Sequence, residues 1–164
     1  MKVLGIDPGT AACGYGIVHV NGERLRATCH GWWHTEASER VEDRLLTIFT
    51  GVQELIATHA PDAVALEESY VGADARIALS VGQARGAVLV AAASAGLACV
   101  EYAPAHVKQA VCGYGRADKA QVQRMVQMIL GLDDLPRPDH AADALAVAIC
   151  HALTPTRLAE ALGR

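Results

Sequence analysis

Four side chains in three separate segments of this 164-residue chain have the chemistry of a divalent-metal site. Asp7 ends the apolar run KVLGI, and Glu67 ends the apolar segment AVALE. His140 and Asp143 are three residues apart, which puts them on one face of a helix. Converging carboxylates repel one another without a cation, and oxygen-rich sites suit Mg²⁺ or Mn²⁺. Because two such ions clamp the attacking and leaving oxygens in phosphodiester hydrolysis, the set predicts a two-metal nuclease site.

Each of these residues also has a purely structural interpretation. The D-P-G sequence that starts at Asp7 is a favourable turn after a strand. Glu67 and Glu68 can be solvated charges at a strand end. Asp139 and Asp143 can be a helix cap and a helix-surface residue. It is the combination of three segments that favours the metal site.

Hydrophobic periodicity and turn signals predict the elements that must position these residues. We expect strands at 2–6, 16–20, 24–34, 63–67 and 97–102, and helices from Glu39 (with Ser38 as N-cap) to just before Pro61, then at 75–95, 104–113, 118–130 and 138–153. Three antiparallel strands followed by parallel strand–helix units predict an α/β fold with a mixed five-stranded sheet flanked by helices, which is the RNase H-like layout. Its first and fourth strands should be neighbours, so Asp7 and Glu67 would project side by side. We expect one domain at 1–155 and a loose C-terminal tail at 156–164.

Composition limits the possible function classes. The chain is 52% hydrophobic and 20% charged, as expected for one globular domain. Its cysteines are scattered without a C-x-x-C pair, and we find neither a signal peptide nor a membrane-length apolar run, so we expect a cytoplasmic protein. The net charge of -4 argues against a simple basic nucleic-acid binder. However, residues 1–68 and 133–164 are acidic, whereas residues 69–132 are basic and could face phosphates.

Six ordered motifs identify a family. The chain resembles the bacterial RuvC family of Holliday-junction resolvases over nearly its whole length. The matching motifs are LGIDPGTAACGYGIV (4–18), ALEESY (65–70), GQARGAV (82–88), EYAPAHVKQAVCGYG (101–115), DKAQVQ (118–123) and HAADALAVAICH (140–151).

The resemblance implies that Asp7, Glu67 and Asp143 are catalytic acids that bind Mg²⁺ or Mn²⁺, two ions per active site. His140 takes the fourth position, where aspartate is commoner in the family. This departure makes the site one charge less negative and favours manganese. Asp139 is adjacent, and motif register favours His140 over it as the ligand.

The resemblance also implies substrate contacts. Tyr70 matches an aromatic position implicated in base contact at the crossover, and Lys108 and Lys119 match basic positions near the junction phosphates. Arg76 and Arg85 are weaker candidates for DNA binding. The structural alternatives are a half-buried tyrosine, solvated helix charges and, for Arg85, an internal salt bridge.

A member of this family is expected to act as a homodimer, with residues 75–95 as a plausible interface. It would cut two opposing strands of like polarity in a four-way junction and leave 5′-phosphate and 3′-hydroxyl ends. It would serve recombination and repair together with branch-migration proteins. Three alternatives are an actin-class ATPase, a junction-binding module without catalysis, and a nuclease for RNA–DNA hybrids. The ATPase would need a second domain, for which 164 residues leave no room. A pure binder gains nothing from clustered acids, and the hybrid nuclease requires a substrate comparison.

Overall fold

Five strands form one mixed sheet in the order β3-β2-β1-β4-β5. The computed structural model describes residues 1–68 and 74–155 of the chain. The strands are β1 (Lys2–Asp7), β2 (Ala12–Asn21), β3 (Arg24–His34), β4 (Ala63–Glu67) and β5 (Cys99–Tyr102). The first three strands are antiparallel, whereas β4 pairs in parallel with β1 and β5 in parallel with β4. This arrangement confirms the predicted α/β fold with a mixed sheet.

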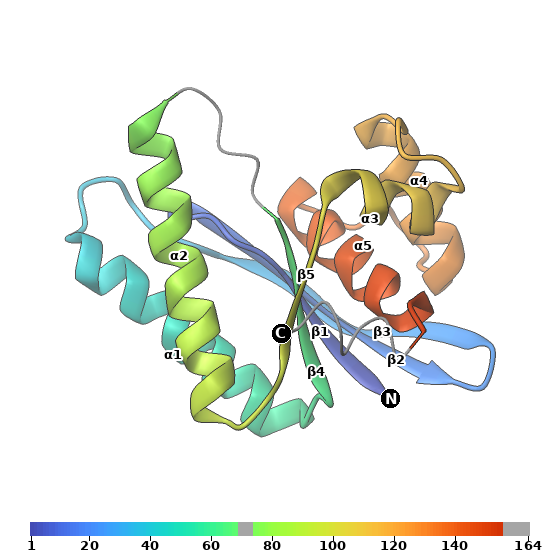
Figure 1. Ribbon diagram of the computed structural model, residues 1–164, viewed down its shortest axis with the longest axis horizontal. Helices are drawn as coiled ribbons and strands as arrows, with labels where there is room; N and C mark the ends of the chain where they lie inside the picture. The colour runs from blue at the N-terminus through green and yellow to red at the C-terminus, as the bar shows by residue number, and fades with distance from the viewer. Residues whose placement is uncertain (69–73, 156–164) are drawn as a thin grey trace.

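Helices cover both faces of the sheet (Figure 1). They are α1 (Val41–His59), α2 (Ala75–Ser94), α3 (Pro104–Cys112), α4 (Lys119–Leu130) and α5 (Asp139–Leu153). Helices α1 and α2 lie on one face, and α3, α4 and α5 lie on the other. Each layer has its own hydrophobic core. Helix α5 is the central element of the second layer, because its residues from Ala144 to His151 are all buried.

Three element boundaries differ by two or more residues from the sequence-based expectation, one of them in β5, which begins at Cys99 rather than Leu97. Strand β2 begins at Ala12 rather than near Gly16, because Gly14 is a strand residue rather than a turn residue and pairs with Asp7. Helix α1 begins two residues later than predicted. Its N-cap is Arg40, in extended conformation and without a side-chain cap, instead of Ser38.

Local signals elsewhere act as expected. The β2–β3 hairpin turns at Gly22, whose φ of 62° is readily adopted by glycine. Helix α4 starts with a capping box in which the Asp118 side chain accepts from the Gln121 backbone N–H, and the Gln121 side chain accepts from the Asp118 backbone N–H.

Helix α2 has an unusual apolar surface. Among the described residues it is the one helix long and apolar enough to meet the criteria for a membrane span, although just 22% of its apolar window is buried. A single helix of this kind is weak evidence for a membrane protein, since helices of soluble proteins meet the same criteria. Its exposed side chains include Leu79 and Val90.

Candidate active site

The parallel pairing of β1 with β4 brings the first two predicted residues to one edge of the sheet. Ile6 is in register with Leu66, so Asp7 and Glu67, the next residues along each strand, lie next to each other. Both come directly after buried strand residues, which fix their backbone positions. This edge is formed by the carboxyl ends of the two strands, where sites in open α/β sheets gather.

Three glycines let helix α5 approach the sheet closely. Gly5, Gly14 and Gly16 lie on neighbouring strands, under α5. A Cβ atom added at Gly5 would lie 2.0 Å from the backbone oxygen of Ala144, and one at Gly16 would lie 2.6 Å from the side chain of Leu145. The missing side chains therefore allow the first turns of α5 to settle on the sheet beside Asp7.

The result is a compact group formed by Asp7, His140 and Asp143. One potential ligand atom from each residue lies within 4.8 Å of the others. The Nδ1–H of His140 donates a hydrogen bond of 2.8 Å to Oδ2 of Asp7. This hydrogen bond raises the pKa of His140 above its ordinary value. The Asp7 side chain is 21% exposed and that of His140 is 45% exposed, so solvent and a substrate can reach the group.

Glu67 stands beside this group rather than within it. Burial, followed by the negative charges of Asp7 and Asp143, raises its pKa to about 7, against the opposing effect of Lys108 and Lys119. Burial, followed by the charge of Asp7, also raises the pKa of Asp143. The site therefore disfavours its own negative charge. A divalent cation would relieve that cost, and the carboxylate and imidazole donors fit such an ion.

Two lysines flank the acids. Lys108 and Lys119 line, with Glu67 and Asp143, a cleft of about 170 Å³ between α3, α4 and α5. The Nζ atom of Lys119 lies 3.4 Å from Asp143 and 3.2 Å from Asp139. The cleft thus combines acids that can hold a cation with cations that can meet a phosphate.

Asp139 has a different environment from the neighbouring His140. Hydrogen bonds from Lys119 and from Gln123 lower its pKa, and its side chain is 61% exposed. It is not a member of the three-residue group. His140, by contrast, hydrogen-bonds to Asp7.

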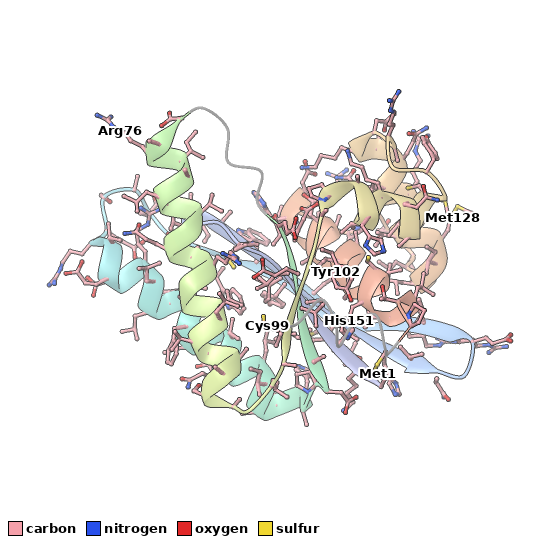
Figure 2. The ribbon with its side chains drawn as sticks, viewed as in Figure 1. Met1, Arg76, Cys99, Tyr102, Met128 and His151 are labelled. Atoms are coloured by element: carbon pink, nitrogen blue, oxygen red, sulfur yellow. The ribbon has the colours of Figure 1, made fainter. Side chains whose placement is uncertain are left out.

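The remaining predicted DNA-binding residues lie elsewhere or outside the described residues. Arg76 is exposed at the beginning of α2 and points away from the sheet (Figure 2). Arg85 forms an ion pair with Glu101, so it takes part in the internal salt bridge that was the structural alternative to DNA binding. Tyr70 lies outside the described residues.

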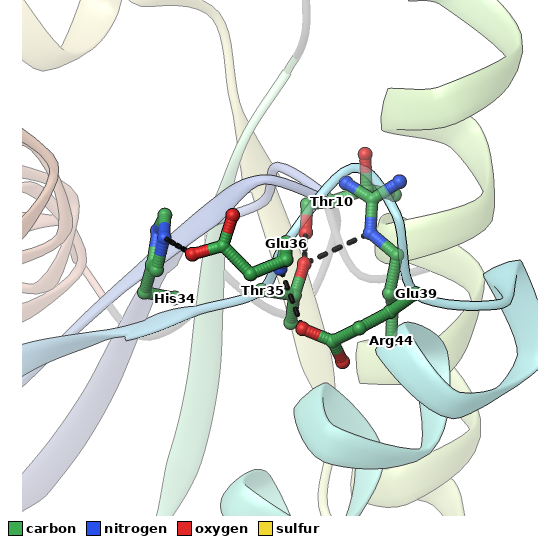
Figure 3. Close-up of polar contacts among 6 residues, drawn as sticks. All are labelled: Thr10, His34, Thr35, Glu36, Glu39 and Arg44. Carbon is green, nitrogen blue, oxygen red and sulfur yellow. Dashed lines mark hydrogen bonds and ion pairs between the residues drawn. The ribbon is translucent and has the colours of Figure 1, made fainter.

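A polar network that the sequence did not reveal holds the turn after Asp7 (Figure 3). The hydroxyl of Thr35, which is 3% exposed, donates to the backbone oxygen of Thr10 and accepts a 2.9 Å hydrogen bond from Nε of Arg44. The Thr10 hydroxyl hydrogen-bonds to Ser80 of α2. The network links the turn to β3, α1 and α2. The residues of this network follow no regular spacing along the chain, so no sequence pattern could have grouped them.

Comparisons with known proteins agree with this architecture. Residues 3–151 match the family model described as crossover junction endodeoxyribonuclease RuvC. The chain is 55% identical over 156 residues to a protein of that name from Heliobacterium modesticaldum, covering 94% of this chain and 96% of the relative. It is 53% identical to the Moorella thermoacetica protein, covering 93% and 91%. It is also similar to the structure of Thermus thermophilus RuvC in complex with Holliday junction substrate, with 43% identity, a TM-score of 0.89 and 93% of each chain covered.

Proposed function

This chain belongs to the RuvC family of crossover junction endodeoxyribonucleases, and we propose that it resolves four-way DNA junctions by paired nicks in strands of like polarity. Each cut would be a hydrolysis by water that leaves a 5′-phosphate and a 3′-hydroxyl, in homologous recombination and DNA repair. The observation that carries this proposal is the Asp7–His140–Asp143 group at the sheet edge, with Glu67 beside it. Membership of the family makes the enzyme class a DNA phosphodiesterase.

The acidic residues act as the metal-binding part of the site. Asp7 sits between the strand-end Glu67 and the helix residues His140 and Asp143, so it is suited to bridge two ions, either Mg²⁺ or Mn²⁺. When bound, these ions would neutralise charge at the scissile phosphate and activate water for the attack. In their absence His140 donates its Nδ1 proton to Asp7, so ion binding by that nitrogen requires loss of this proton.

The two lysines act on the phosphate side of the site. Lys119 spans Asp139 and Asp143, which holds its ammonium group at the mouth of the cleft. Lys108 lines the same cleft and lies near enough to lower the pKa of Glu67. Both would attract the DNA backbone and offset its charge where it passes the acids. A ring at Tyr70 would stack on a base near the crossover.

A homodimer is the assembly that matches a junction, because a two-fold axis relates the two strands to be cut. Helix α2 supports this choice. Leu79, Gly82, Gly86 and Val90 share one face of the helix; Leu79 and Val90 are 65% and 61% exposed, and a Cβ atom added at either glycine would meet no atom within 4 Å. This bare apolar stripe suits close contact with a second copy. Branch-migration proteins would be further partners, and the cytoplasm the compartment.

The test compares cleavage of a mobile four-way junction, a linear duplex and an RNA–DNA hybrid, each with Mg²⁺ or Mn²⁺. We expect paired cuts in the junction that a ligase can reseal. Asp7→Asn should lose cleavage and keep junction binding. Normal cutting by that variant, or preference for the hybrid, would contradict the proposal, and binding by the parent without cutting would indicate a pure junction binder.

A further inference from the structure

Trp32 and Asp7 lie on the same face of the sheet, with one residue between them. Trp32 pairs with Gly14 across β3 and β2, and Gly14 pairs with Asp7 across β2 and β1. Residues directly opposite in antiparallel strands project to one face. Two strand spacings put Trp32 about 10 Å from Asp7. The side chain therefore stands close to the candidate metal site, although nothing in the proposed chemistry uses it.

The space beside Trp32 is a groove of about 710 Å³. Its walls include Trp32 from β3, His140 and Asp139 from the start of α5, and Leu135 and Arg137 from the segment before α5. His140 belongs to both this groove and the acidic group. The groove therefore adjoins the candidate active site through His140.

Two side chains of the groove, Trp32 and Arg137, are exposed without an evident structural role. Trp32 is 46% exposed, which is unusual for so large an apolar side chain. Arg137 is exposed and forms no ion pair with any residue that the structure describes. By contrast, Asp139, the acid in the same groove, is occupied by Lys119 and Gln123. An uncommitted cation beside an exposed indole is the combination that holds a nucleotide, with the base on the ring and the phosphate on the cation.

We propose that this groove is a second DNA subsite, in which a base next to the scissile phosphate stacks on Trp32 while Arg137 contacts a neighbouring phosphate. The inference rests on the proposed function, because a strand must cross the Asp7–His140–Asp143 group for its next nucleotide to reach the groove. Its occupant is unpaired or locally unstacked DNA, since a base within a duplex does not offer its face to an indole. The subsite would hold the strand in register during cutting.

The chain provides its own optical test, because it contains only two tryptophans. Trp33 projects to the opposite face, where its ring packs 4.6 Å from that of Tyr15 and against Gly51. In a Trp33→Phe, Asp7→Asn protein, the fluorescence of Trp32 alone should be quenched when a junction binds. A junction with 2-aminopurine placed at successive positions around the cut should locate the stacked base.

Affinity measurements complete the test. Trp32→Ala should weaken junction binding about 5- to 150-fold, whereas Trp32→Phe keeps most of the affinity. Arg137→Ala should lower the dependence of log Kd on log salt by about one. Met128→Ala is the matched control, since Met128 is 73% exposed and does not line the groove, so this variant should bind like the parent.

The possible failures are distinguishable. Parental affinity in Trp32→Ala, or unquenched Trp32 on junction binding, would overturn the subsite while leaving junction cleavage by the parent intact. An effect of Trp32→Ala that appears only with a second protein present would overturn it too, in favour of a protein-docking groove. A parent that does not cut junctions would remove the proposed function and this inference together.

Discussion

The alpha carbon of Gly14 lies directly beneath the carbonyl oxygen of His140, and a Cβ atom there would be 2.0 Å from that oxygen. Gly14 is also the cross-strand partner of Asp7. One glycine thus determines both how close α5 comes to the sheet and how close His140 comes to Asp7, which it meets through a 2.8 Å hydrogen bond.

Gly14→Ala should therefore damage the site through the backbone. The added methyl group has to push the first turn of α5 away, which should cost about 1–3 kcal/mol of unfolding free energy. A displacement of about 1 Å in His140 and Asp143 should lower the cleavage rate about 100-fold. Urea unfolding, cation titration and junction cleavage would measure these effects. Cleavage at the parental rate would mean that α5 can shift without disturbing the ligands.

Glu67→Gln should stabilise the protein when no divalent ion is present. The pKa of Glu67 rises on folding to about 7. A carboxyl group whose pKa is raised on folding stabilises the protein at pH values below the pKa it has in the unfolded chain. This stabilisation is lost as the pH rises through the pKa it has in the folded protein. At pH 8 with chelator, the variant should thus exceed the parent by about 1–3 kcal/mol, and the gap should close near pH 4.

The same substitution should abolish most of the stabilisation that Mg²⁺ gives the parent. Thermal unfolding with chelator and with Mg²⁺, at both pH values, checks the two effects together. A variant that is less stable than the parent at pH 8 would show that Glu67 is satisfied by its protein neighbours and carries no electrostatic cost.

His140→Asp should change the metal preference. A fourth carboxylate adds negative charge and an oxygen ligand, so Mg²⁺ should bind more tightly and the ratio of Mn²⁺ to Mg²⁺ activity should fall several-fold. In the parent, the pKa of His140 is raised by the bond to Asp7. Below that raised pKa the protonated ring cannot bind an ion, so the parent should lose cation affinity as pH falls toward 6.5. Calorimetric titration with each ion from pH 6 to 8 measures the affinities, and junction cleavage with each ion measures the activity ratio. An unchanged ratio would exclude His140 as a ligand.

Strand-end acids were the most predictable part of the site. Asp7 and Glu67 end short apolar runs, and parallel pairing is enough to bring such residues to one edge. The position of His140 and Asp143 was less accessible. It depends on Gly14 and Gly16, which lie under α5. Gly14 looks like a turn residue in the sequence because glycine is common in turns, and its strand role becomes visible only when a helix is packed on it.

Pairings between distant elements were out of reach for a different reason. The partner of Arg85 is Glu101 in β5. The helical pattern around Arg85 does not specify which residue of another element it will contact. Thr35 reaches Thr10 because β3 runs beside β2, and either hydroxyl alone is an ordinary surface candidate. Such contacts depend on tertiary geometry, whereas periodicity reports only on local structure.

Lys119→Met should reduce cleavage about 10- to 100-fold. In the parent, the ammonium group of Lys119 lies 3.4 Å from Asp143 and lowers the pKa of that carboxyl. Its removal therefore makes Asp143 harder to ionise. The substitution also removes a cation facing the phosphates, so the salt dependence of junction binding should fall by about one. Arg124→Ala is the control on the same helix, exposed and expected to cut within about twofold of the parent. Equal loss in both variants would indicate a general charge effect of α4.

Leu79→Glu should separate the two subunits without touching the acids. In the proposed dimer this side chain, 65% exposed in one copy, is buried against the second. Burying an unpaired carboxylate costs about 2 kcal/mol or more, so dimer affinity should fall at least about 30-fold, as sedimentation would show. Met128→Glu introduces the same charge on α4, on the opposite face of the sheet, and should remain dimeric.

On a plasmid with an extruded cruciform, the Leu79→Glu protein should produce nicked circles, because one subunit cuts one strand, whereas the parent and Met128→Glu should produce linear molecules. Linear products from a monomeric Leu79→Glu protein would show that paired cutting does not require the α2 interface.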